Sequence, residues 1–288
     1  MTATTRTLDV PGAVLTYDVR GPLPTADGQP PLLMVGQPMD AGGFATLASF
    51  FDDRTVVTYD PRGLGRSTRS DGSVENRPEQ QAEDLHALVG ALGSGQVDLF
   101  GSSGGAVTSL ALVAAHPSDV RTLVAHEPPV LCVLPDAALA SAAEDTVRQA
   151  YHQRGWGAGM AAFIALTSWK GEFTADFGEG LPDPAAFGLP TQDDGSRADP
   201  LLSGASAAVT AYSPDIAALL DAPTRIVIAA GIESEDLMTW RASAALAGDL
   251  GQELTVFPSH HGGFLGDELG QAGQPEAFAA RLREVLAG

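Results

Sequence analysis

Cysteine and lysine are almost absent from this sequence. Cys132 is the single cysteine among 288 residues, so an intrachain disulfide and a thiolate metal cluster are excluded. Lys170 is the single lysine, and 16 basic residues face 36 acidic ones, which gives a net charge of −20. A charge of this sign disfavours nucleic acid, anionic membrane surfaces and bulky polyanionic substrates as partners.

Long apolar runs are also missing. No run approaches the roughly 18 residues of a membrane-spanning helix, and residues 1–10 lack the basic start and apolar stretch of a signal peptide. We therefore expect a cytoplasmic protein that binds a small-molecule substrate and neither nucleic acid nor a membrane. The sequence leaves open whether the protein forms a homodimer. With 44% hydrophobic residues, the chain can bury one sizeable core.

Short apolar runs alternate with segments of helical periodicity along most of the chain. Strands are predicted at residues 8–19 (a pair broken at Pro11-Gly12), 32–36, 55–59, 97–100, 121–125, 224–230 and 253–257. Helices are predicted at residues 78–92, 104–115, 237–247 and 275–286. This alternation indicates an α/β fold, in which helices cover both faces of a mostly parallel sheet.

Residues 131–221 interrupt this alternation and divide a core made of residues 1–130 and 222–288. The interval begins with helical periodicity and continues rich in Pro, Gly and Asp; its 12 acidic and 4 basic residues give a net charge of −8. We expect a mainly helical lid over the carboxyl ends of the strands, where ligands of open α/β sheets bind. Trp156, Met160 and Phe163 are expected to line an apolar substrate pocket, although they could instead pack the lid against itself.

The strand at 97–100 runs straight into GSSGG at 101–105 and then into a helix. The order strand, G-x-S-x-G, helix is typical of a nucleophile elbow, whose tight turn tolerates only very small residues two positions to either side. Ser103 has glycine at both positions, whereas Ser102 would have Phe100 at one, so Ser103 is the predicted nucleophile. The run fits neither a Walker loop nor a dinucleotide fingerprint; the other interpretation is a glycine-rich turn without chemistry.

A family resemblance appears in the same region. Residues 99–129, LFGSSGGAVTSLALVAAHPSDVRTLVAHEPP, resemble the nucleophile region of lidded α/β-hydrolases, which include esterases, carbon–carbon bond hydrolases and cofactor-free haloperoxidases. The resemblance extends from about residue 32 to the C-terminus and weakens across 131–221. It implies the α/β-hydrolase fold with no metal and no organic cofactor. A serine nucleophile argues against haloalkane dehalogenase and epoxide hydrolase chemistry, which use aspartate.

The resemblance also implies the oxyanion hole and the general base. Gly36-Gln37-Pro38 matches the family's oxyanion loop, so the backbone N–H groups of Gln37 and Gly104 are the expected donors. The other interpretation of Gln37 is an ordinary loop residue before a proline. The family places the base immediately before Gly-Gly-Phe, which selects His261 over His260.

The acid of the triad departs from the commoner family pattern. The usual position is Ser234, and the acidic residues Glu233, Glu235 and Asp236 surround it in the sequence. A second position used in the family, at the end of the strand after the nucleophile, holds Glu127, 24 residues after Ser103. We expect the two strands to be neighbours in the sheet and therefore favour Glu127 over Glu233. The alternative for Glu127 is a carboxylate that ends a strand and caps a lid segment.

These features predict a serine hydrolase that cleaves an acyl-type bond through a covalent acyl-enzyme. We expect a carboxylic ester of a small to medium, largely apolar substrate, because the acidic lid disfavours anions. Two other classes remain open at this point. One is a non-hydrolytic lyase, cyclase or acyltransferase with the same triad, and the other is a catalytically silent protein that binds a small ligand.

Overall fold

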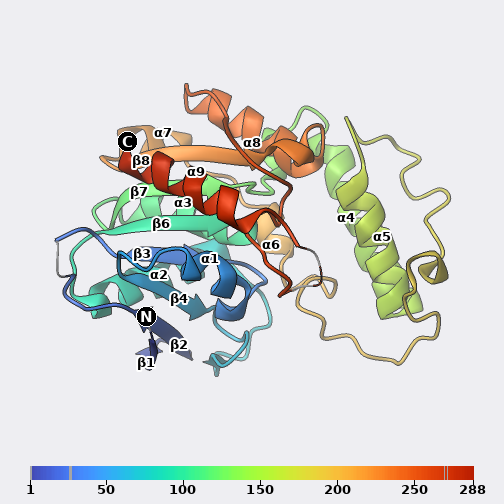
Figure 1. Cartoon of the computed structure of the whole chain (residues 1–288). Helices are drawn as coiled ribbons and strands as arrows, with labels where there is room; N and C mark the ends of the chain where they lie inside the picture. The colour runs from blue at the N-terminus through green and yellow to red at the C-terminus, as the bar shows by residue number, and fades with distance from the viewer. Residues whose placement is uncertain (1, 26–27, 269, 271) are drawn as a thin grey trace.

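The computed structural model describes residues 2–25, 28–268, 270 and 272–288, and its strands form one sheet (Figure 1). The order is β1-β2-β4-β3-β6-β7-β8-β9, with β5 beside β2. The strands are β1 (Ala3–Val10), β2 (Ala13–Arg20), β3 (Leu32–Val35), β4 (Val56–Asp60), β5 (Thr68–Arg69), β6 (Val97–Ser102), β7 (Val120–His126), β8 (Arg225–Gly231) and β9 (Thr255–Phe257).

Strands β4, β3, β6, β7, β8 and β9 pair in parallel, and β1, β2 and β5 pair antiparallel. The parallel strands at the centre are short apolar runs because both of their faces are covered, and every residue of β3, β4 and β6 is buried. The β1–β2 hairpin turns at Gly12, whose φ of 76° suits glycine. The predicted mostly parallel sheet is therefore confirmed.

Helices cover both faces of the sheet. They are α1 (Ala45–Ser49), α2 (Pro78–Leu92), α3 (Gly104–Ala115), α8 (Met238–Asp249) and α9 (Pro275–Ala287). On one face α2, α3 and α8 bury Leu85, Leu110 and Leu246 in one apolar cluster. On the other face α1 and α9 bury Leu47 and Leu282 in a second cluster. The predicted α/β layering is confirmed.

Residues 131–221 add helices beyond this layered core. They form η2 (Leu131–Val133), α4 (Ala137–Arg154), α5 (Trp156–Ser168), η3 (Pro184–Phe187), α6 (Ala207–Thr210) and α7 (Ile216–Asp221). Helices α4 and α5 pack on each other and stand at the right-hand side of Figure 1; their apolar cluster also includes Met238 and Ala242 of α8. Helix α7 instead packs on α3, and its Leu219 joins the core cluster.

None of the helices in the described part of the chain combines the length and the apolar composition needed to cross a membrane.

Candidate active site

The chain turns sharply at Ser103, between β6 and α3. Ser103 has φ 57° and ψ −128°, a conformation that L-residues rarely adopt and that costs about 1–3 kcal/mol. Its backbone N–H donates to the carbonyl of His126 at 2.9 Å, and its own carbonyl accepts from Ala106 N–H at 2.9 Å. These two hydrogen bonds hold the strained residue at the carboxyl end of the sheet.

The glycines around Ser103 are required by close packing. A Cβ on Gly101 would lie 2.6 Å from Ser109 Oγ, and a Cβ on Gly105 would lie 2.1 Å from the carbonyl oxygen of Val35 on β3. Real Cβ atoms do not approach other atoms so closely, so neither position accepts a side chain. The spacing that singled out Ser103 in the sequence thus has a direct physical basis. Ser102, by contrast, is the buried last residue of β6.

Strand pairing brings the predicted acid next to the predicted nucleophile. β7 lies parallel beside β6, with Ser102 opposite His126, so Ser103 and Glu127 leave the two strands at the same level. The expectation that these strands are neighbours is confirmed. Glu127 has φ 49°, which is unusual for a residue with a side chain. The strands therefore deliver both residues to one edge of the sheet.

Glu127 is buried and contacts the predicted base. His261 Nδ1 lies 2.6 Å from Glu127 Oε2, and an ionised carboxylate can only accept, so Nδ1–H donates. Thr239 Oγ1 donates to the same oxygen at 2.6 Å, and Gly231 N–H donates to Oε1 at 3.0 Å. Three donors thus fix a carboxylate that has no exposed surface.

The contact between Glu127 and His261 shifts the pKa of both residues. Burial alone would raise the pKa of Glu127, but the charge and hydrogen bond of His261, helped by Thr239, hold that pKa well below its usual range. Burial alone would lower the pKa of His261, but the charge of Glu127 and its hydrogen bond outweigh burial and raise it. Although the site is deep, 43% of the His261 side chain is accessible, so a substrate can reach the ring.

The competing acids point elsewhere. Glu233 is exposed, and its Oε1 accepts from Gln274 Nε2 at 3.0 Å. Glu235 and Asp236 are also exposed, while Ser234 is wholly buried. The structure therefore brings Glu127, and not Glu233, to His261.

The two neighbouring histidines differ in their contacts. His260 Nδ1 accepts from the backbone N–H of Gly262 at 3.0 Å and has no contact with Glu127 in the described part of the chain. The loop lies directly on the end of β8, since a Cβ on Gly231 would be 2.5 Å from the carbonyl oxygen of Ser259. This close packing sets which histidine faces the carboxylate.

The two expected oxyanion donors lie against each other. A Cβ on Gly104 would be 2.7 Å from Gln37 O and 3.0 Å from Gln37 Cβ. Val209 of α6 lies equally close, with its Cγ1 3.0 Å from the same point, so α6 borders this part of the site. Gln37 is buried, and its carboxamide has no hydrogen-bond partner among the described residues. The Ser103 hydroxyl likewise makes no hydrogen bond to a residue in the described part of the chain.

His126 is a buried neighbour of the predicted base, and the sequence did not mark it as functional. Its ring packs among Phe100, Phe257 and Phe278, and its centroid lies 6.3 Å from that of His261. Burial lowers the pKa of His126 to about 4, although the charge of Glu127 acts in the opposite direction. His126 is therefore neutral at neutral pH and adds no second positive charge beside His261.

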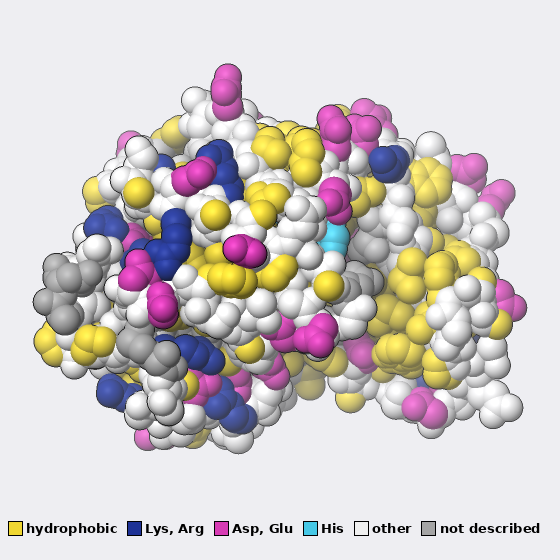
Figure 2. Space-filling model, viewed as in Figure 1, with side chains coloured by type: hydrophobic (Ala, Val, Ile, Leu, Met, Phe, Trp, Pro, Cys, Tyr) yellow, Lys and Arg dark blue, Asp and Glu magenta, His cyan; other side chains and the backbone are white. Residues whose placement is uncertain are grey.

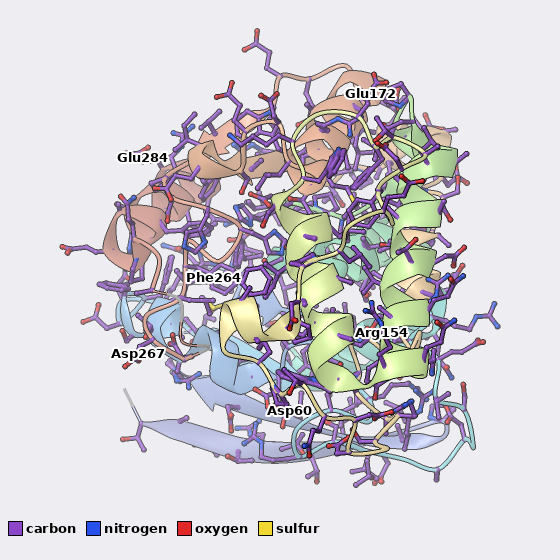
Figure 3. All side chains as sticks on the ribbon, turned by 90° about the vertical axis from the view of Figure 1, so that its right-hand side faces the viewer. Asp60, Arg154, Glu172, Phe264, Asp267 and Glu284 are labelled. Carbon is purple, nitrogen blue, oxygen red and sulfur yellow. The ribbon has the colours of Figure 1, made fainter. Side chains whose placement is uncertain are left out.

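The residues expected to line a substrate pocket lie on α5. Trp156, Met160 and Phe163 are each half-buried and pack on the cluster formed by α4 and α5. Trp156 Nε1 also donates to Asp199 Oδ2 at 2.9 Å, so part of this side chain holds the segment together. Figure 2 shows the molecule hollowed between the main body and the α4–α5 part, with hydrophobic side chains gathered beside the hollow. Figure 3 looks at the molecule from the α4–α5 side.

Two groups that hold Glu127 in place were missed by sequence reasoning. Thr239, in the first turn of α8, and the backbone N–H of Gly231 have no local pattern that would reveal them. Only the pairing of β8 with β7, and the packing of α8 on β8, brings them to the carboxylate.

Known proteins agree with this architecture. A Bacillus subtilis protein called uncharacterized hydrolase YraK is 31% identical over 291 residues, which cover 99% of this chain and 97% of that protein. The esterase RhEst1 from Rhodococcus has a similar structure, with TM-score 0.67, 19% identity and coverage of 100% of this chain and 99% of that one. An esterase from Thermogutta terrifontis gives TM-score 0.64, 21% identity and coverage of 100% and 98%.

A family model that matches most of the chain identifies the family. The family model described as alpha/beta hydrolase fold matches residues 32–267, from β3 to the loop that carries His261. The resemblance found in the nucleophile region is thereby confirmed. The chain belongs to the α/β-hydrolase fold family.

Proposed function

We propose that this protein is a serine hydrolase that cleaves a carboxylic ester through a covalent acyl-enzyme. The observation that carries the proposal is the 2.6 Å contact between His261 Nδ1 and Glu127 Oε2, beside the strained turn at Ser103. A base oriented by a buried carboxylate, next to a hydroxyl on a nucleophile elbow, is the arrangement that activates serine.

In this proposal Ser103 attacks, His261 moves the protons, Glu127 orients His261, and two backbone N–H groups bind the oxyanion. Glu127 holds Nδ1–H of His261, which leaves Nε2 as the base that takes the proton of Ser103 as its oxygen attacks the carbonyl carbon. The backbone N–H groups of Gln37 and Gly104 stabilise the negative charge that develops on the carbonyl oxygen. His261 then gives its proton to the leaving alcohol, and a water molecule, activated by the same ring, hydrolyses the acyl-enzyme.

We further propose that the inserted residues 131–221 act as a lid on the core of residues 1–130 and 222–288. The half-buried side chains of Trp156, Met160 and Phe163 would supply its apolar lining, and the hollow in Figure 2 supports this placement. The net charge of −8 on this interval favours neutral substrates over anionic ones.

Replacing Ser103 or His261 tests the catalytic assignment. With a p-nitrophenyl ester as substrate, Ser103→Ala and His261→Ala should each lower kcat by about 10⁴-fold or more, because a triad acts as a unit. His260→Ala is the matched control and should change kcat little, since the ring of His260 contacts Gly262 and not Glu127. If Ser103→Ala keeps its turnover, the protein is not a serine hydrolase; if His260→Ala is the more damaging change, the base has been misassigned.

The acid can be tested by comparing two isosteric variants. Glu127→Gln should lower kcat by up to about 10⁴-fold, and Glu233→Gln should leave it nearly unchanged. The pH profile adds a second readout. His261 must be neutral to act, so kcat/KM should rise with pH, with its midpoint above the ordinary histidine pKa of about 6.5.

Glu127→Gln removes the charge that raises the pKa of His261, so the remaining activity should reach its midpoint at lower pH. An unshifted midpoint with near-normal kcat in Glu127→Gln, and a large loss in Glu233→Gln, would contradict the assignment.

The apolar lid is tested by a series of esters of increasing acyl length. Each methylene buried in the pocket should raise kcat/KM by about fourfold, the equivalent of about 0.8 kcal/mol. Phe163→Ala should flatten this dependence, and Phe187→Ala, which alters an exposed side chain, should not. An unchanged dependence in Phe163→Ala would place the acyl chain elsewhere, and a kinetic preference for polyanionic esters would contradict the lid proposal.

A further inference from the structure

Two short acid–histidine pairs meet on the surface at the far end of α3 from Ser103. Glu83 and His86 are three residues apart on α2, so they share one face of that helix. His116 ends α3, and Asp119 follows three residues later in the turn before β7. This turn is closed by a hydrogen bond from Asp119 N–H to His116 O at 3.0 Å.

Each histidine forms a hydrogen bond with the carboxylate of the other pair and not with that of its own pair. His86 Nδ1 donates to Asp119 Oδ2 at 2.6 Å, and His116 Nε2 donates to Glu83 Oε1 at 2.8 Å. The two rings stack, with centroids 3.8 Å apart and planes 9° from parallel. Ligand atoms of His86, His116 and Asp119 all lie within 4.8 Å of one another.

We propose that Glu83, His86, His116 and Asp119 form a binding site for a divalent transition-metal cation of the Zn²⁺ type. Two imidazole nitrogens and two carboxylate oxygens are a donor set that suits Zn²⁺ in tetrahedral geometry. The net charge of −20 attracts cations to the protein. The site is distinct from the triad and goes beyond the proposed hydrolysis.

The present side-chain geometry needs only local adjustment to hold the ion. Bonds of about 2.0–2.2 Å to Zn²⁺ place neighbouring ligand atoms about 3.3 Å apart. The His86–Asp119 and His116–Glu83 contacts, now 2.6 and 2.8 Å, would lengthen slightly. The other ligand atoms of His86, His116 and Asp119, which lie within 4.8 Å of one another, would move closer. The two imidazole rings would rotate so that they no longer stack. Glu83 and His86 can move, since their side chains are 63% and 48% exposed.

The backbone that carries these ligands is already held in place. Helices α2 and α3 pack on each other, and α2 buries Leu85 and Leu88 between them and the sheet. A bound ion would therefore tie α2 to the end of α3 and stabilise the folded chain by an amount that grows with the ratio of the free Zn²⁺ concentration to Kd. Because α3 spans about 18 Å, the ion would lie far from Ser103 and should leave ester hydrolysis unchanged.

Calorimetric titration of the metal-free protein with Zn²⁺ tests the site. We expect one saturable ion at this site and a Tm that rises with the Zn²⁺ concentration. His86→Gln and His116→Gln should each weaken binding by at least about tenfold, since even residues that only support metal ligands contribute 10–100-fold. His152→Gln is the matched control: this exposed histidine contacts Ser203 O on another part of the surface and should bind Zn²⁺ like the unaltered protein.

Two results would overturn the proposal. One is the lack of saturable Zn²⁺ binding in the millimolar range. The other is unchanged binding in the protein with both His86→Gln and His116→Gln, which would place the ion elsewhere. Should that protein fail to fold, as judged by its Tm without metal, Glu83→Gln serves in its place. Its side chain is mostly exposed, and the proposal requires it to weaken Zn²⁺ binding while leaving the metal-free Tm unchanged.

Discussion

The candidate site depends on the parallel pairing of β6 with β7. Because Ser102 lies opposite His126, the next residue of each strand, Ser103 and Glu127, leaves the sheet at the same level. Both have positive φ, so each side chain is directed by a backbone conformation that the surrounding packing must maintain. A shift of this pairing by one residue would move Ser103 and Glu127 to different levels of the sheet.

Hydrogen bonds and charge then stabilise the buried carboxylate of Glu127. A carboxylate without exposed surface is stable only when donors surround it, and Glu127 receives hydrogen bonds from His261, Thr239 and Gly231. The contact between Glu127 and His261 lowers the pKa of the carboxyl group and raises the pKa of the imidazole. Burial lowers the pKa of the neighbouring His126 to about 4, so its ring is neutral at neutral pH and adds no positive charge beside His261.

The sequence predicted those parts of the molecule that local rules control. Apolar runs and helical periodicity gave the layers of the fold, and the steric demand for glycine on both sides of Ser103 singled out the turn. The short elements α1 and β5 were missed, because five and two residues are too few for a periodic pattern. Contacts between distant segments were also missed, including Thr239 on Glu127 and Val209 beside Gly104.

The carboxylate that contacts His261 could be predicted only in part from local sequence patterns, because its position also depends on contacts between distant segments. Family spacing left Glu127 and Glu233 as alternatives, and only the strand pairing and the Gln274 contact of Glu233 separate them in space. The crossed pairs of Glu83, His86, His116 and Asp119 lie wholly beyond sequence reasoning, since 33 residues separate each histidine from the carboxylate that it contacts.

Covalent labelling tests the central claim most directly. A fluorophosphonate reacts with a serine only where a base and an oxyanion hole activate it. Peptide mass spectrometry of the labelled, folded protein should find a single adduct on Ser103, and none after His261→Ala. No adduct in the folded protein would favour a ligand-binding protein without turnover, and an adduct on Ser102 would contradict the assignment of the nucleophile.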